Sequence, residues 1–372
     1  MLNIGITGQE GFLGKHLYNY IMLFSNEFKI VEYKKDFFEN PEKLNHFVSK
    51  CDVIVHLAAM NRHNDSQLIY DTNMALVEKL IKALVQTKNK PHIIFSSSTQ
   101  EEKNNLYGKS KKDGRALMKK YAKSLGFKFT GMIIPNVFGP FGLPNYNSVV
   151  ATFCHKLTHN QTPIIKIDTK MKLIYVGELV IKILNEVRKN EGNDQVVVSH
   201  SSECSVSELL FLLKNYKLLY QIKGEIPKIK NTFELNLFNT YRSYMDIKSH
   251  FPVKLTQHSD NRGSFVELIR LGIGGQVSFS TTEPKITRGN HFHTRKIERF
   301  AVIKGKALIQ LRRIGTNEVL DFYLDGNEPA YVDMPIWYTH NIKNIGDEVL
   351  YTNFWINEPY NPSNADTYFE EV

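Results

Sequence analysis

The residue pattern of this chain changes near residue 250, and that change limits the folds available to it. Before it, short apolar runs rich in Val and Ile alternate with segments of helical spacing; after it, short β-rich runs follow one another between Gly, Pro and Asn turns. The first pattern is typical of a parallel sheet with helices on both faces, and the second of a β-sandwich or barrel. We therefore predict an α/β Rossmann-like doubly wound parallel sheet followed by an all-β domain.

The boundaries of the expected elements follow from these runs. The expected strands of the first part are 2–7, 28–33, 52–59 and 92–98, and its helices are 12–24, 42–49, 66–87 and 107–125. From 145 to 245 the pattern loosens, and we expect a small substrate lobe with a helix over 148–159, a strand over 164–167, a strand leading into a helix over 173–188, and a helix opened by a capping box at Ser205. We predict domains 1–245 and 250–372.

Composition restricts the compartment and the partners. The 372 residues carry a net charge of +9, which suits an anionic ligand such as a nucleotide-sugar, with nucleic acid or an anionic membrane surface as alternatives. The lysines are dispersed and no recognition motif is present, so we expect no nucleic-acid partner. Three separated cysteines, an opening strand in place of a signal peptide and the lack of a bilayer-length apolar stretch predict a cytoplasmic protein with no membrane partner.

Glycines follow the first expected strand at the turn into the first expected helix. The segment 7–14 has the spacing Gly-x-x-Gly-x-x-Gly. Glycine allows the backbone to turn tightly and to approach a pyrophosphate, whose charge is stabilised by the N–H groups at a helix start. This position predicts a dinucleotide site that consists of Gly8, Gly11, Phe12, Leu13 and Gly14.

The turn after the second expected strand bears on the choice of dinucleotide. A carboxylate there binds the ribose hydroxyls of NAD, whereas a cation accommodates the additional phosphate of NADP. Lys34 and Lys35 favour NADPH, although Glu32 and Asp36 flank them and two solvated lysines would look the same.

Tyr107 and Lys111 are separated by one helical turn at the start of an expected helix. This spacing lets the ammonium lie near the phenol, and we expect it to lower the pKa of Tyr107 from about 10 toward neutrality. Tyr107 could then give a proton to a ketone oxygen while a hydride reaches the carbon, and Ser98, at the end of the fourth expected strand, would hold the same oxygen. A Tyr-x-x-x-Lys pair on a helix surface is the competing interpretation.

Four residues of the β-rich part have the spacing of a metal site. His291 and His293 are two apart, which puts them on one face of a strand, and Glu298 and His340 can come from other strands. Three imidazoles and a carboxylate suit zinc, with iron, manganese or nickel possible.

Residues 1–245 resemble the sugar-nucleotide branch of the extended short-chain dehydrogenases/reductases. The matching segments are 7–14, 56–59, Asn73, 96–98, Tyr107 with Lys111, 135–140 and 174–176. The resemblance implies a catalytic Ser98–Tyr107–Lys111 set, cofactor contacts from Leu57, Ala58 and Asn73, and a substrate contact from Asn136. Two features depart from the family: the interval from Ser98 to Tyr107 is short, so that Thr99 could replace Ser98, and Ile133 and Ile134 stand where the family often has an Arg.

Residues 289–305 and 335–340 resemble the two cupin motifs, with Trp337 where that family usually has Gly. Segments 260–267 and 287–291 also resemble deoxysugar-nucleotide 3,5-epimerases, which share the cupin (jelly-roll) fold. That second resemblance makes His291 a proton-abstracting base and Arg262 and Arg288 anion-binding candidates, with ordinary surface arginines as the alternative for both. His291 thus carries two incompatible roles, and the ligand spacing of His293 and Glu298 favours the role of ligand.

The whole chain resembles the CapF-type bifunctional enzymes of capsular polysaccharide synthesis, through segments 144–154, 260–265 and 366–369. The resemblance implies a homodimer that acts on UDP-2-acetamido-2,6-dideoxy-β-L-arabino-hex-4-ulose, a UDP-linked 4-keto-6-deoxy-N-acetylhexosamine. The cupin would epimerise C3, and the first domain would then reduce C4 with NADPH to the L-talose product, on the route to N-acetyl-L-fucosamine. Two alternatives remain: a single-activity 4-ketoreductase with a ligand-binding or dimerising barrel, and a non-catalytic redox sensor.

Overall fold

The computed structural model describes residues 1–372. The chain forms two compact units, Met1–Val150 with Ile167–Val206, and Ala151–Lys166 with Ser207–Val372. The predicted doubly wound sheet lies in the first unit and the predicted all-β domain in the second, so the fold class is confirmed. Segments 151–166 and 207–245, which we expected in a lobe of the first sheet, pack in the unit that contains the barrel. The boundary at 245–250 stays a prediction.

A six-stranded sheet of order β2-β1-β3-β4-β5-β8, in which every pairing is parallel, forms the centre of the first unit. Its strands are β1 (Leu2–Thr7), β2 (Phe28–Val31), β3 (Val53–His56), β4 (His92–Ser98), β5 (Phe129–Ile134) and β8 (Asn193–Val197). The chain runs from β1 to β2 on one side and to β3 on the other. The carboxyl ends of β1 and β3 therefore flank the point where strand order reverses, which is where such sheets bind ligands.

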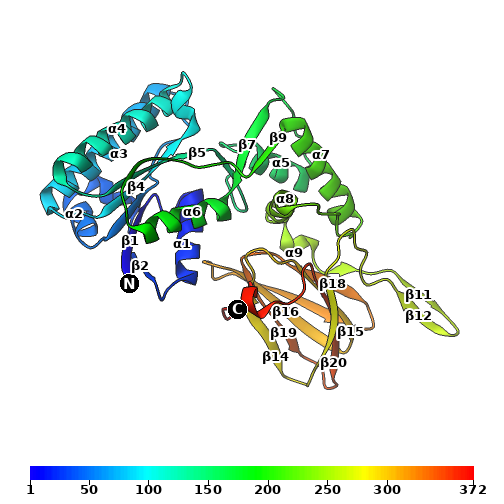
Figure 1. Cartoon of the computed structure of the whole chain (residues 1–372). Coiled ribbons are helices and arrows are strands. Elements are labelled where there is room, and N and C mark those ends of the chain that lie inside the picture. Colours follow the sequence, from blue (N-terminus) through cyan, green and yellow to red (C-terminus); the bar gives the residue numbers. More distant parts are fainter. The chain divides into compact units, whose positions relative to one another are not determined.

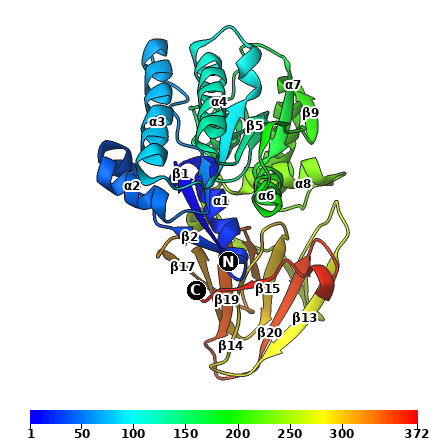
Figure 2. The same cartoon turned by 60° about the vertical axis from the view of Figure 1, so that its left-hand side comes forward.

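Helices cover both faces of this sheet (Figures 1 and 2). The helices α2 (Pro41–Ser49), α3 (Ser66–Thr87) and α4 (Leu106–Leu125) bury Phe47, Leu80 and Met118 against one face. The helices α1 (Phe12–Leu23) and α6 (Val176–Lys189) bury Leu17 and Ile183 against the other. The four helices predicted over 12–24, 42–49, 66–87 and 107–125 are confirmed as α1 to α4. The strand–helix segment predicted over 173–188 is confirmed as β7 and α6.

A small sheet of order β6-β7-β9 completes the first unit, with β6 (Asn136–Phe138), β7 (Lys170–Tyr175) and β9 (Ser202–Ser205). The strand expected over 164–167 is wrong: the segment is irregular, and Ile164 and Ile167 are 71% and 73% exposed. A short apolar run predicts a strand only where a neighbouring strand can pair with it and bury one face.

The second unit begins with helices. These are α5 (Val149–Thr158), α7 (Val206–Tyr216), a π-helix (Lys217–Ile222), α8 (Thr232–Arg242) and α9 (Ile247–His250). The helices expected over 148–159 and after the capping box at Ser205 are confirmed. Neither α8 nor the π-helix was expected.

Two five-stranded antiparallel sheets form the barrel. One has the order β10-β18-β15-β20-β13 and the other β17-β16-β19-β14-β21. The first contains β10 (Val253–Lys254), β13 (Gln276–Thr282), β15 (Glu298–Lys304), β18 (Ala330–Met334) and β20 (Leu350–Ile356). The second contains β14 (Thr287–Phe292), β16 (Lys306–Arg313), β17 (Val319–Asp325), β19 (Tyr338–Asn344) and β21 (Tyr368–Phe369). Alternate residues such as Val302, Ile309 and Val332 fill the core between them.

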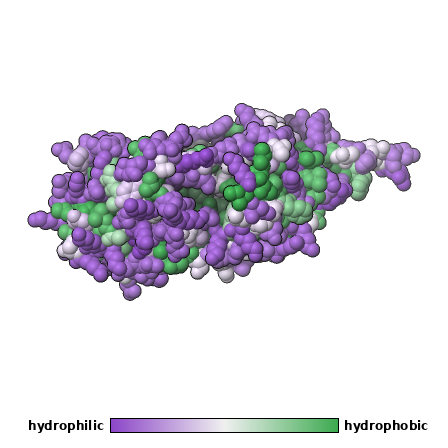
Figure 3. All heavy atoms as spheres, turned by 90° about the horizontal axis from the view of Figure 1, so that it is seen from above, coloured by the Kyte–Doolittle hydropathy of each residue, from purple (hydrophilic) through white to green (hydrophobic).

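A hairpin of β11 (Gln257–Asp260) and β12 (Gly263–Val266) projects from the barrel and pairs with no other strand (Figure 1). The face drawn in Figure 3 is mainly hydrophilic, with hydrophobic patches that are separate from one another. None of the helices combines the length and the apolar character that crossing a bilayer requires.

Candidate active site and metal centre

The glycine loop joins β1 to α1 at the carboxyl edge of the parallel sheet. Gly8 adopts φ +76°, and a Cβ built on it would lie 2.8 Å from the backbone nitrogen of Ala58. A Cβ on Gly14 would lie 2.3 Å from the carbonyl oxygen of Gly8. Gly11 caps α1 without a side-chain hydrogen bond, so the first amides of that helix remain directed at the loop. This geometry suits a pyrophosphate held at a helix N-terminus.

The neighbouring positions behave differently from one another. Phe12 and Leu13 begin α1, and Leu57 and Ala58 follow β3 directly beside Gly8. Lys34 and Lys35 lie after β2 and are exposed, and the Lys34 ammonium lies 3.0 Å from a carboxylate oxygen of Glu32. No protein contact holds the ammonium group of either lysine near the glycine loop, where a cofactor phosphate would lie.

Asn73 supports the loop after β3. Its side-chain oxygen accepts from the backbone N–H of Met60 at 2.7 Å, and its amide nitrogen donates to the Met60 carbonyl at 3.1 Å and to Ser110 at 2.9 Å. The side chain is buried, so its hydrogen-bonding groups are taken by the protein. The structure therefore gives Asn73 the role of holding residue 60 against α4.

Ser98, Tyr107 and Lys111 lie where β4 meets the start of α4. Ser98 caps a short 3-10 turn (Thr99–Glu102), and the Lys111 ammonium donates to the Ser96 carbonyl at 2.9 Å, 6.0 Å from the centre of the Tyr107 ring. The short interval between Ser98 and Tyr107 is filled by this turn, which packs so closely on α4 that a Cβ on Gly108 would lie 1.9 Å from the Gln100 carbonyl oxygen. Thr99 is exposed.

The pKa values of this pair differ from expectation. Burial raises the pKa of Tyr107 to about 12, and burial lowers the pKa of Lys111 to about 8 although Glu101 opposes that shift. The lowering expected for Tyr107 is not seen, because burial disfavours the charged phenolate and so raises the pKa. Tyr107 therefore keeps its proton at neutral pH.

Glu101 and Arg115 stabilise the 3-10 turn that follows Ser98, and sequence reasoning missed both residues. Arg115 donates to both carboxylate oxygens of Glu101, at 2.8 and 2.7 Å, and Ser97 donates to the same carboxylate. The Arg115 side chain is only 15% exposed and the Glu101 side chain 6%. The one possible signal in the sequence is a pair of opposite charges, one in the turn before α4 and one within that helix.

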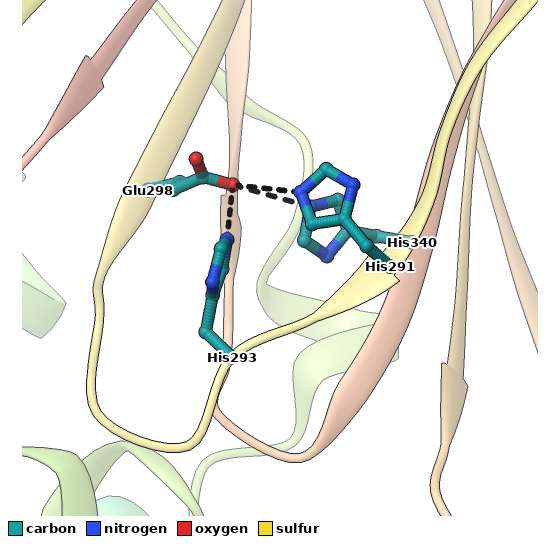
Figure 4. A group of neighbouring side chains, drawn as sticks. All are labelled: His291, His293, Glu298 and His340. Atoms are coloured by element: carbon teal, nitrogen blue, oxygen red, sulfur yellow. Dashed lines mark ion pairs between the residues drawn. The ribbon is translucent and has the colours of Figure 1, made fainter. Parts of the chain in front are cut away.

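His291, His293, Glu298 and His340 come together at one end of the barrel (Figure 4). The Nε2 atoms of His293 and His340 each lie 3.1 Å from Oε2 of Glu298, and that of His291 lies 4.0 Å from it. His291 and His340 face each other across the paired strands β14 and β19, Glu298 starts β15, and His293 follows β14 by one residue. The predicted grouping is thus present.

The electrostatics of the cluster favour a cation. Oε2 of Glu298 and the Nε2 atoms of His293 and His340 are buried and have no hydrogen-bond donor or acceptor in ordinary geometry. Burial opposes ionisation of Glu298, yet the nearby His293 and His340 imidazoles hold its pKa below the usual range. Burial and the nearby His340 lower the pKa of His291 to about 4, so His291 is neutral. Three imidazole nitrogens and a carboxylate oxygen, within 4.8 Å of one another, form a donor set that zinc accepts.

The three remaining predicted residues are dispersed. Arg262 lies at the tip of the β11–β12 hairpin and pairs with Asp260 at 2.6 Å. Arg288 lies on β14, three residues before His291, and donates to the Thr281 carbonyl at 3.1 Å. Asn136 is exposed at the start of β6 in the first unit. Of the two predicted arginines, Arg288 is the one that lies on the same strand as a candidate metal ligand, His291.

Trp337 occupies a backbone conformation that favours glycine. Its φ is +62°, its N–H donates to the His293 carbonyl at 2.8 Å, and its ring lies 5.6 Å from that of Phe292. A left-handed residue three positions before His340 explains why a glycine is usual in this motif. With tryptophan at this position, the backbone N–H still donates to the carbonyl of the candidate ligand His293.

Comparisons with known proteins agree with both halves of the geometry. The NAD dependent epimerase/dehydratase family matches residues 4–199, and the polysaccharide biosynthesis C-terminal domain matches residues 258–368. The structure of the capsular polysaccharide assembling protein CapF from Staphylococcus aureus matches over 100% of both chains, with 34% identity and a TM-score of 0.64. The chain belongs to the CapF-type family.

Two further proteins are similar to this CapF-type chain, one over its full length and one over its first part. A UDP-2-acetamido-2,6-beta-L-arabino-hexul-4-ose reductase of Pseudomonas aeruginosa is 29% identical over 376 residues, which cover 99% of this chain and 98% of that protein. The structure of RMD from Pseudomonas aeruginosa complexed with NADPH is 20% identical, with a TM-score of 0.53, over 59% of this chain and 84% of that one. The second likeness shows the fold alone.

Proposed function

We propose that the protein converts a UDP-linked 4-keto-6-deoxy-N-acetylhexosamine in two steps: epimerisation at C3 in the barrel and reduction at C4 in the first unit, with NADPH, for surface polysaccharide synthesis. The observation that carries the proposal is the presence on one chain of a Tyr107–Lys111 pair beside a dinucleotide-type loop and of a His–Glu cluster in a barrel. The full-length likeness to a 4-ketosugar reductase and to CapF supports it.

Tyr107 would act as the proton donor of the reduction. A nicotinamide bound at the glycine loop would supply the hydride to C4. The raised pKa of Tyr107 keeps its phenol protonated, as a group that gives a proton to the developing alkoxide must be. Lys111 is buried beside the ring and would stabilise the phenolate left after transfer, and Ser98 would hold the C4 oxygen by a hydrogen bond.

His291, His293, Glu298 and His340 would hold a zinc ion in the barrel. The donor set fits a divalent cation because three buried acceptor atoms converge and lack donors of their own. A bound metal would supply a positive charge that stabilises the enolate formed when the C3 proton leaves. Arg288, on the same strand as His291, would pair with the diphosphate of the substrate.

His291 keeps a second possible role as the base that removes the C3 proton. It is the least buried of the four, with 25% of its side chain exposed against 3% for His293 and 1% for His340, and its low pKa leaves it unprotonated. Under that alternative, His293, Glu298 and His340 would be the three protein ligands, a number usual for catalytic zinc. A His291→Ala variant that keeps its metal but loses C3 exchange would favour the role of base.

We also propose a cytoplasmic homodimer. The edge strand β13 carries exposed Val277 and Phe279, and its outer backbone groups pair with no strand of this chain. The unpaired backbone groups of such an edge can pair with a strand of another chain, and a second copy would supply that strand.

Proton NMR of the UDP-4-ketosugar in D₂O, with enzyme but without NADPH, tests the barrel reaction. We expect the C3 proton signal to disappear, and treatment with a chelator to stop its loss. If C3 does not exchange while NADPH is still oxidised in a parallel sample, the protein is a reductase with a barrel that binds ligand or dimerises.

Tyr107→Phe tests the reduction. We expect turnover of NADPH to fall by about 10²–10⁴-fold, the range of general acid catalysis, while C3 exchange continues. The matched control is Tyr70→Phe. It removes a phenol on α3 that donates to Asp113 on α4 at 2.9 Å. Unchanged turnover in the Tyr107→Phe enzyme would refute the catalytic assignment.

A further inference from the structure

The connection between the ligand strands β14 and β15 is held by Asp366, from the far end of the chain, together with Asn239 and Asn357, which bond to the Arg295 carbonyl and the Ile297 N–H. Residues 294–297 join His293 to Glu298 and contain no regular structure of their own. The carboxylate of Asp366 accepts from the backbone N–H and the hydroxyl of Thr294, at 3.1 and 2.6 Å, and from the N–H groups of Arg295 and Lys296, at 3.0 and 3.1 Å. Three consecutive amides thus point at one carboxylate whose side chain is fully buried.

The same residue contacts a metal ligand directly. The Nδ1–H of His293 donates to the backbone carbonyl of Asp366. Because Nδ1 carries the proton, the lone pair of the ring lies on Nε2, the atom that faces Glu298. Asp366 has φ +46°, which turns its carbonyl and its carboxylate toward the same loop.

The segment around Asp366 is itself anchored to the barrel. The strand β21 pairs with β14 through His291 with Phe369 and Phe292 with Tyr368, and the Phe292 and Tyr368 rings stack at 5.4 Å. Arg295 donates to Glu358 at 2.9 Å on the side of the loop that faces solvent. These contacts hold Asp366 in place without themselves touching His293, Glu298 or His340.

We infer that Asp366 is the positioning residue of the metal centre: it fixes the orientation of His293 and the spacing of His293 from Glu298, and so controls how tightly the metal is retained. The inference rests on the proposed metal centre. Partners of this kind, which bind a ligating histidine through its other nitrogen, usually change metal affinity by about 10–100-fold when replaced. Asp366 adds to that effect because it also fixes the loop that leads to the next ligand.

The test compares zinc release from wild-type full-length protein, Asp366→Asn and the control Glu358→Gln, with a chromophoric chelator as acceptor. Asparagine keeps the shape and the backbone carbonyl that accepts from His293, but it places an amide group against the backbone donors of the loop, so the variant tests the hold of the carboxylate on that loop. We expect zinc to leave Asp366→Asn about 10–100-fold faster than wild type, and Glu358→Gln to stay within about twofold because Glu358 pairs only with the Arg295 and Lys296 side chains and not with the backbone of the loop. Cobalt(II) spectra of the same proteins should show altered ligand geometry for Asp366→Asn alone.

Melting temperatures of the chelator-treated proteins separate positioning from folding. If Asp366→Asn lowers the melting temperature of the metal-free protein but releases zinc at the wild-type rate, the residue is structural and the inference is overturned. If wild type binds no zinc, the proposed metal centre fails and the inference fails with it, which is a distinct result. If Asp366→Asn does not fold, Thr294→Val carries the test: release no faster than wild type overturns the inference.

Discussion

Replacement of Arg299 by methionine should destabilise the second unit strongly, because it leaves a buried charge without its partner. Arg299 donates to both oxygens of Asp333, at 2.7 and 3.0 Å, and the two side chains are 3% and 0% exposed. Tyr220 donates to the same carboxylate at 2.7 Å. Methionine keeps most of the volume, but the change also removes the Arg299 hydrogen bond to the Gly224 carbonyl and its contact with the Tyr331 ring, both of which add to the loss.

Loss of one partner of a buried ion pair costs about 3–5 kcal/mol. At about 2–4 °C per kcal/mol for units of this size, the melting temperature should fall by about 6–20 °C. The measurement is calorimetric unfolding in the presence of a chelator, so that the neighbouring Glu298 binds no metal in any sample. The matched control is Lys254→Met, which breaks an exposed pair with Glu328 and should cost less than about 1 kcal/mol.

The pH dependence has a defined sign. Burial alone would raise the pKa of Asp333, but the charge and hydrogen bonds of Arg299 hold it below its usual value. The stabilisation is therefore present above the unfolded carboxyl pKa of about 4 and is lost as the pH falls through the folded value. The difference between wild type and Arg299→Met should narrow in acid.

Two results would refute this reasoning. One is an Arg299→Met protein no less stable than Lys254→Met. The other is a double variant, Arg299→Met with Asp333→Leu, as unstable as the single one, since removal of both charges should restore part of the stability.

Three other substitutions have expected outcomes. Gly8→Ala should weaken NADPH binding at least about tenfold and cost about 1–3 kcal/mol of stability, because φ +76° and the close Ala58 nitrogen exclude a Cβ; Gly11→Ala, at φ −75°, is the milder control in both fluorescence titration and thermal melting. Lys111→Met should stabilise the protein at pH 7 by up to about 3 kcal/mol, at about 1.4 kcal/mol per pKa unit, and the gain should vanish between pH 8 and 10.5, since the folded pKa of about 8 lies below the unfolded 10.5; a gain that persists at pH 11 in urea unfolding would contradict this. Trp337→Gly should relieve about 1–3 kcal/mol of backbone strain but lose about 3–5 kcal/mol of packing, so a higher melting temperature would contradict the packing estimate.

The elements that sequence periodicity predicted well are those whose burial is apolar and local. The glycine loop, β4 and α4 carry their signals in neighbouring residues, and the four ligand-type residues of the barrel follow strand spacing. The helix α8 escaped prediction because polar side chains occupy its buried face, among them Asn236, Asn239 and Arg242. The buried apolar residues Leu237, Phe238 and Tyr241 are interspersed with these polar ones, so the apolar stripe is hard to see in the sequence.

Long-range contacts account for the rest. Asp366 reaches the loop after His293 from more than seventy residues away in sequence, as the separation of 72 to Thr294 records. Nothing in a run of small and polar residues near the C-terminus indicates that partner. The pKa of Tyr107 was mispredicted for a related reason: the spacing to Lys111 was correct, but the burial of both groups and the Ser96 carbonyl become visible only in three dimensions.

The path of the chain through its two compact units has a consequence for synthesis on the ribosome. The chain leaves the first unit after residue 150, returns to it at 167 and leaves it again after 206. When α5 emerges, the strands and helices that bury it have not yet been made, and β8 of the first sheet is also still missing. A gene truncated at residue 245 would therefore encode a complete first unit together with helices stripped of their barrel, and a gene that began at residue 250 would encode a barrel without the Tyr220 and Arg242 side chains that contact Asp333 and Met334. Neither product is a natural module, so exchange of such domains between genes would have to carry the helices along with the barrel.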